Sequence, residues 1–139
     1  AEVEILPLAA SEGLGVISYS PLGGGLLTGK YGVEKRPQVG RLLQQENYIK
    51  RYANPVYYQV AEKFVQYAAD KDVHPATLAV AWVMSHPDVT APIIGGRNIE
   101  QLEPSLAALD FDMSVGMRDE ISALSVAPPP ATDRAETQG

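Results

Sequence analysis

Two short apolar runs constrain the fold of this chain more than any other feature. Residues 16–19 and 89–94 are rich in β-branched side chains, and consecutive glycines follow each run within a few residues. Runs of this kind favour buried strands over helices. Because helical patterns follow both strands, the sequence predicts an α/β fold with a parallel sheet and right-handed crossovers. A pair of parallel strands is stable only when a larger layer covers both of its faces. The chain is therefore expected to be part of a larger architecture.

Capping residues mark the starts of the expected helices. Asn54 precedes Pro55, which combines an N-cap side chain with the residue that best tolerates the first helical position. A second helix, apolar on nearly all sides, is expected over 75–84, and later helices are expected to begin at Asn98 and Ser114. We also expect the last turns of a helix in 1–12. The long connection from 23 to 55 has room for a helical turn or two within 39–51.

Apolar stripes predict which helix faces are buried. The residues expected to face a core are Tyr57, Val60, Ala61, Phe64 and Ala68, then Leu102, Leu106 and Leu109, and finally Met117, Ile121 and Leu124. An apolar helix face around Leu78, Trp82 and Val83 is expected to be exposed, together with the strand edges. Surface of this kind favours self-association or pairing with a complementary N-terminal fragment.

Charge and cysteine content narrow the possible functions. The 139 residues include 11 Lys and Arg against 17 Asp and Glu, a formal net charge of −6, so nucleic acid is not an expected partner. No apolar run approaches a membrane span of roughly 18 to 20 residues, and no secretory signal pattern is present, so we expect no membrane partner and a cytoplasmic location. The chain has no cysteine, and the spacing of His74 and His86 fits no metal motif, so no metal site is expected.

The segment from Gly24 to Lys30 has the G-x-x-x-x-G-K spacing of a phosphate-binding loop and follows an expected strand. However, Tyr31 stands where that motif needs Ser or Thr to bind magnesium, and no acidic partner follows a second strand. A nucleoside triphosphatase is therefore not expected. The glycine turns instead predict a ligand site at the carboxyl ends of the two strands, where parallel α/β folds place their ligands.

Three motifs occur in order along the chain. They are EILPL at 4–8 with GLGVISYSPLGGGLLTGKY at 13–31, LAVAWV at 78–83, and IIGGRNIEQL at 93–102. Together they resemble the aldo-keto reductase family, in its bacterial and potassium-channel-β-subunit-like branch. The resemblance covers 1–125 and implies the C-terminal portion of a (β/α)₈ TIM barrel, about two strands with their helices. A whole barrel takes about 250 residues, so this portion is expected to be incomplete as a barrel. Residues 126–139 are expected to be a flexible, proline-rich tail.

The resemblance implies hydride transfer between NADPH and an aldehyde or ketone. The NADP(H)-binding residues that it implies are Tyr19, Ser20, Pro21, Leu22, Gly24, Lys30, Arg41, Gly95, Gly96, Arg97 and Gln101. In this alignment Tyr19 stacks on the nicotinamide ring and the turn after it lines the pyrophosphate. Lys30 and Arg41 approach the phosphates, and the residues from Gly95 onward hold the adenosine end.

Simpler interpretations of these residues stay open. Tyr19 fits equally a core position at the end of an apolar strand, and Lys30 and Arg41 fit surface positions. Pro104 and Ser105 replace the acidic residue and asparagine usual in the family, so we expect weaker contacts to adenine.

The catalytic Asp, Tyr, Lys and His of that family belong to the first half of its barrel. We therefore expect no catalytic residue in this chain and no carbonyl reductase turnover from it alone, since nothing would protonate the developing alkoxide. A carbonyl substrate is expected only where the barrel is completed. The alternative is a catalytically inactive, truncated relative that acts as a nucleotide-binding or self-associating structural module.

Overall fold

The two expected strands pair with each other. In the computed structural model, which describes residues 1–127, β1 (Ile17–Tyr19) and β2 (Ala91–Ile93) form a two-stranded parallel sheet. Ser18 lies opposite Pro92 in the register. The expected parallel sheet within an α/β chain is thus confirmed, whereas the barrel remains a prediction. The predicted tail lies almost wholly outside the described residues.

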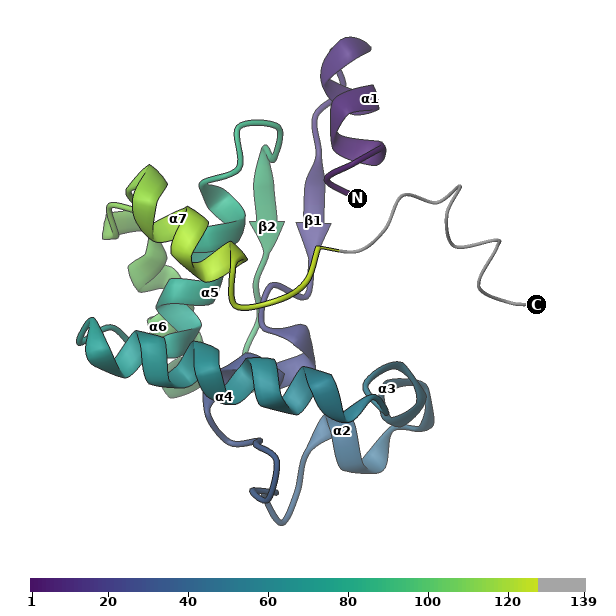
Figure 1. Cartoon of the computed structure of the whole chain (residues 1–139), viewed down its shortest axis with the longest axis vertical. Coiled ribbons are helices and arrows are strands. Elements are labelled where there is room, and N and C mark those ends of the chain that lie inside the picture. The colour runs from purple at the N-terminus through teal and green to yellow at the C-terminus, as the bar shows by residue number, and fades with distance from the viewer. Residues whose placement is uncertain (128–139) are drawn as a thin grey trace.

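Most helices lie on one side of the sheet or beyond its carboxyl end, whereas the N-terminal helix lies on the opposite side, next to β1 (Figure 1). They are α1 (Ile5–Ser11), the 3₁₀ segment η1 (Gly23–Thr28), α2 (Arg41–Gln44), α3 (Glu46–Arg51), α4 (Pro55–Asp70), α5 (Pro75–Met84), α6 (Ile99–Leu106), the 3₁₀ segment η2 (Ala107–Asp110) and α7 (Val115–Ser122). Figure 1 shows β1 and β2 side by side, with α5, α6 and α7 to one side and α2, α3 and α4 beyond the strand ends. Within the described part of the chain, no helix is both long and apolar enough to cross a membrane.

Side-chain caps form at the helix starts that the sequence predicts. Oδ1 of Asn54 accepts a hydrogen bond from the Val56 amide at 3.0 Å, and Oδ1 of Asn98 accepts one from the Gln101 amide at 3.0 Å. Ser114 caps α7 in the same way. These bonds satisfy amides that have no partner within the helix, which is why the sequence signals located the helix starts well.

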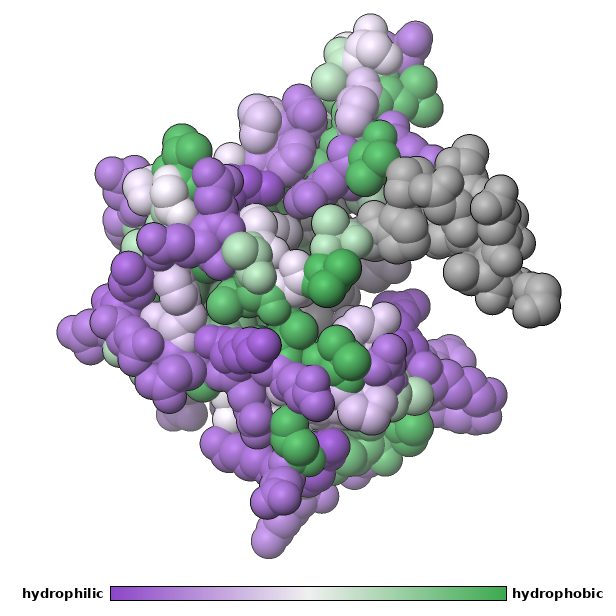
Figure 2. Space-filling model, viewed as in Figure 1, coloured by the Kyte–Doolittle hydropathy of each residue, from purple (hydrophilic) through white to green (hydrophobic). Residues whose placement is uncertain are grey.

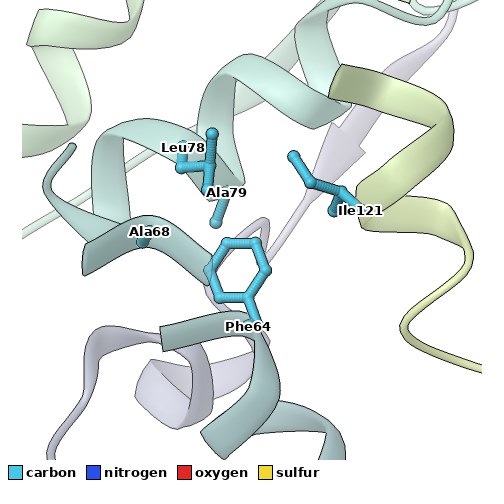
Figure 3. Close-up of a cluster of buried hydrophobic side chains, with 5 residues drawn as sticks. All are labelled: Phe64, Ala68, Leu78, Ala79 and Ile121. Atoms are coloured by element: carbon cyan, nitrogen blue, oxygen red, sulfur yellow. The ribbon is translucent and has the colours of Figure 1, made fainter. Parts of the chain in front are cut away.

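The main core lies where α4, α5 and α7 meet. Figure 3 shows Phe64 and Ala68 of α4 facing Leu78 and Ala79 of α5, with Ile121 of α7 closing the cluster. A second cluster lies under the glycine turn and joins it to α2 and α4; its buried members are Leu26, Tyr31, Leu42 and Ala61. The core expectations for α4 and α7 are confirmed except at Tyr57, which is exposed on the first turn of α4.

The stripe predicted after Asn98 is wrong at two of its three positions. Leu106 and Leu109 are 45% and 71% exposed, whereas Ser105 and Ala108 are buried. The buried positions, Ser105 and Ala108, are three residues apart, which is the spacing of one turn of the 3₁₀ segment η2 that follows α6. The predicted stripe stepped four residues from Leu102 and so passed over Ser105.

The expected exposed helix face on α5 is also wrong. Leu78 is fully buried, and Trp82 packs against α7, where its indole Nε1 donates to Oγ of Ser122 at 3.2 Å. Exposed apolar side chains occur instead on one face of the sheet, at Ile17, Tyr19 and Ile93. Figure 2 shows hydrophilic side chains over α4 and α7 and hydrophobic ones gathered near the centre of this view.

Candidate functional site

The chain leaves β1 through a strained turn. The Tyr19 side chain is 69% exposed at the end of the strand, and Ser20 has a positive φ of 59°. Its carbonyl accepts a hydrogen bond from the Gly23 amide at 2.9 Å. The next glycines, Gly24 and Gly25, also have positive φ, 67° and 96°. Left-handed conformations at a residue other than glycine are costly and gather at functional sites, so the turn is a candidate ligand site.

Side chains from later in the sequence lie against this turn. A Cβ on Gly24 would lie 2.7 Å from the ring of Tyr48, and a Cβ on Gly25 would lie 2.9 Å from Cε of Lys30. Gly24 is therefore required by space as well as by φ, whereas Gly25 is required mainly by φ, because the end of the Lys30 side chain can move. Pro21 and Leu22 are half-buried. The side chain of Leu22 packs against the core clusters, so only the backbone of Leu22 is available to contact a ligand.

The charges of Arg41 and Arg97, from distant parts of the chain, act on Lys30 beside the turn. Partial burial, and then the charges of Arg97 and Arg41, hold the pKa of Lys30 below its ordinary value of 10.5. In residues 1–127 the cations that lie within salt-bridge distance of a carboxylate are others: Lys50, Lys71 and Arg118. Lys30, Arg41 and Arg97, called here the cation cluster, are therefore without a carboxylate partner among the described residues. Such an arrangement suits an anion.

The second glycine turn brings the remaining predicted residues to the start of α6. Asn98 caps the helix, and Oε1 of Gln101 accepts a hydrogen bond from the Arg97 amide at 3.3 Å. A Cβ on Gly96 would lie 3.0 Å from the carbonyl of Asn98, whereas nothing lies within 4 Å of the same position on Gly95. Gly96 thus allows a close backbone approach, and the space over Gly95 is open. Positive helix-end amides favour a negative group here.

Sequence reasoning missed an aromatic cluster beside Tyr19. Tyr48 of α3 and Tyr52, which follows α3, stack with ring centroids 6.3 Å apart, and Tyr57 meets Tyr52 edge to face at 6.1 Å. Burial is the main cause that raises the pKa of Tyr52, with Tyr19 among the neighbouring groups. The only signal in the sequence was the spacing of four residues between Tyr48 and Tyr52, although the helical turns expected here ended at 51.

An open cavity lies elsewhere on the molecule, and none of the predicted site residues lines it. Its volume is about 690 Å³, and it is an open groove between the segment after η1 and α4. Two of its charged groups already have partners, since Glu62 accepts from the Val33 amide at 2.7 Å and Lys35 donates to the Gly29 carbonyl at 2.6 Å. We therefore place the candidate site at the strand ends.

Replacing Arg97 with alanine is expected to raise the pKa of Lys30 toward 10.5. Arg97 is one of the like charges that disfavour the Lys30 ammonium, while the effect of partial burial stays. The titration can be followed by NMR of the Lys30 ¹³Cε. Arg51→Ala is the matched control, because Arg51 is not among the groups that shift Lys30. Equal Lys30 pKa values in the Arg97 variant and the parent protein would show that the two cations do not interact.

Comparison with known proteins points to one family. The model of the aldo/keto reductase family matches residues 1–125. An uncharacterised oxidoreductase of Bacillus subtilis is 37% identical over 113 residues, which cover 81% of this chain and 32% of the relative. A probable aldo-keto reductase of Glycine max is 34% identical over 118 residues, covering 81% of this chain and 32% of the relative.

A probable voltage-gated potassium channel β-subunit of Oryza sativa subsp. japonica is 34% identical over 138 residues, which cover 95% of this chain and 42% of the relative. The chain thus spans between 32% and 42% of the length of these relatives. The matched region includes both glycine turns and the cation cluster.

Proposed function

The chain belongs to the aldo/keto reductase family, and from this premise we propose that it forms the NADP(H)-binding part of an oxidoreductase that reduces aldehydes or ketones. The observation that carries the proposal is the cation cluster, because the charges of Arg41 and Arg97 act on Lys30 and none of the three has a carboxylate partner in residues 1–127. A dinucleotide with a 2′-phosphate is an anion of matching charge and extent.

The described residues suit such a cofactor in their chemistry and exposure. The Tyr19 ring is exposed at the strand end, where it offers a flat apolar face to a nicotinamide ring. Lys30 and Arg41 would bind phosphate oxygens, and Arg97 with the α6 amides would bind the group on the adenosine ribose. When bound, NADPH supplies the hydride that adds to a carbonyl carbon. The proposal gives these residues roles in binding and orientation and none in proton transfer.

The test is the affinity of the full-length protein for NADPH, measured by calorimetry with Lys30 and Arg41 both replaced by alanine. Each charge-assisted hydrogen bond contributes about 1.5 to 3 kcal/mol, so the loss of two is expected to weaken binding by the double variant by at least roughly 100-fold. Lys63→Ala is the matched control, because Lys63 is an exposed cation on α4 that lines the groove described above and not the candidate site. Equal affinity in the double variant and the parent would reject the proposed site.

The exposed sheet face favours a second role in association. Ile17, Tyr19 and Ile93 are exposed on the sheet, and so are Ile5 and Leu8 on α1. We propose that this apolar surface is covered either by a second copy of the chain or by a complementary part of a barrel. The 139-residue chain alone is then expected to self-associate. Light scattering after size-exclusion chromatography measures this, and a monodisperse monomer with a cooperative melt would contradict it.

A further inference from the structure

Tyr48 is the residue through which α3 contacts the glycine turn. A Cβ on Gly24 would lie 2.7 Å from its ring, and the ring also packs against the buried cluster that includes Leu42. The guanidinium groups of Arg41 and Arg51 lie 5.4 and 5.5 Å from its centroid. One aromatic side chain therefore contacts both the turn and a member of the cation cluster.

The ring of Tyr48 lies beside the side chain of Arg41. Arg41 is exposed, and its guanidinium lies over the face of Tyr48. An exposed arginine with no fixed partner samples many rotamers. The conformational entropy that it loses when a ligand orders it weakens binding. The attraction between a cation and an aromatic face restricts those rotamers before a ligand arrives.

The geometry points to Tyr48 as a positioning residue for the anion site. We propose that its ring holds Arg41 toward Lys30 and Arg97, so that the cation cluster is assembled before the phosphate groups bind. The inference rests on the proposed function, because the anion concerned is the phosphate of a nucleotide. Tyr48 itself need not touch that anion.

The test is a double-mutant cycle in the full-length protein, with adenosine 2′,5′-bisphosphate as the probe and calorimetry as the measurement. Tyr48→Leu keeps apolar bulk and removes the aromatic face, so it is expected to weaken binding roughly 2- to 5-fold. Tyr48→Phe keeps the face and should bind like the parent protein. Arg41→Ala should weaken binding roughly tenfold or more.

Non-additivity separates positioning from a purely structural role. If Tyr48 acts through Arg41, then Tyr48→Leu causes no further loss when Arg41 is already alanine. An equal loss in both backgrounds would overturn the inference and leave the proposed function standing. Tyr57→Leu is the matched control, because Tyr57 belongs to the same aromatic cluster and contacts Tyr52. We expect it to leave the affinity unchanged.

Proteolysis of the ligand-free protein supplies a readout that needs no nucleotide. Cleavage by trypsin after Arg41 is expected to be faster in Tyr48→Leu than in Tyr48→Phe or Tyr57→Leu, since a held arginine is a poorer substrate. Equal rates in all three would overturn the inference. A parent protein that binds no bisphosphate would instead reject the proposed function and, with it, the role of Tyr48 in binding.

Discussion

Replacing Arg97 with alanine is expected to remove a preference for NADPH over NADH of roughly 10- to 150-fold. The two nucleotides differ by a 2′-phosphate that is largely dianionic near neutral pH. One charge-assisted bond to it contributes about 1.5 to 3 kcal/mol, which sets that range. Arg97 belongs to the cation cluster and precedes the capped start of α6, where helix-end amides add to the attraction.

The measurement is the ratio of the NADPH and NADH dissociation constants of the full-length protein, before and after the substitution. Arg97→Lys is the informative comparison, because it keeps the positive charge and removes the bidentate guanidinium. Its ratio of dissociation constants should fall between those of the parent protein and Arg97→Ala. Glu100 lies in the first turn of α6 but not within salt-bridge distance of Arg97 in the described residues. A ratio that Arg97→Ala leaves unchanged would make Arg97 a surface cation without a role in selectivity.

The largest loss of stability is expected from Phe64→Ala. Phe64 is 4% exposed and packs at the junction of α4, α5 and α7 (Figure 3). Removing a buried aromatic ring typically lowers the free energy of unfolding by about 3 to 5 kcal/mol, because the cavity left behind does not close fully. In a small α/β unit that is a large share of the total stability.

Urea denaturation of the full-length protein measures this difference in unfolding free energy, provided that the variant and the parent protein have the same m-value. Leu109→Ala is the control, since Leu109 lies on η2 and is largely exposed. It should change stability by less than about 0.5 kcal/mol. The α-helical stripe predicted the reverse for Leu109, so a large loss there would restore the sequence-based core assignment.

Local signals in the sequence located the elements that position the site. The caps at Asn54, Asn98 and Ser114 and the glycine turns after both strands are where the sequence placed them. Each of these features depends on residues within a few positions of one another, because a cap or a tight turn is made by a short stretch of chain. The family was likewise readable from contiguous motifs.

Features that depend on more than one element were not readable. The sequence did not show that α4 and α7 cover Leu78, or that Ser105 and Ala108 are buried in place of Leu106 and Leu109. It also gave no role to Tyr48, because the neighbours that matter, Gly24 and Arg41, are close to Tyr48 in space and not adjacent to it in sequence. Packing partners far apart in the chain have no signature in a local pattern.

The chemistry of the candidate site divides in the same way. The sequence by itself determined the strand ends, the glycines that permit left-handed turns, and which residues are cations. Only the tertiary structure decided that Lys30, Arg41 and Arg97 share one region without a carboxylate partner among the described residues. The physical reason is that electrostatic interaction depends on distance in space, and parallel pairing of β1 with β2 is what brings the two glycine turns to the same edge.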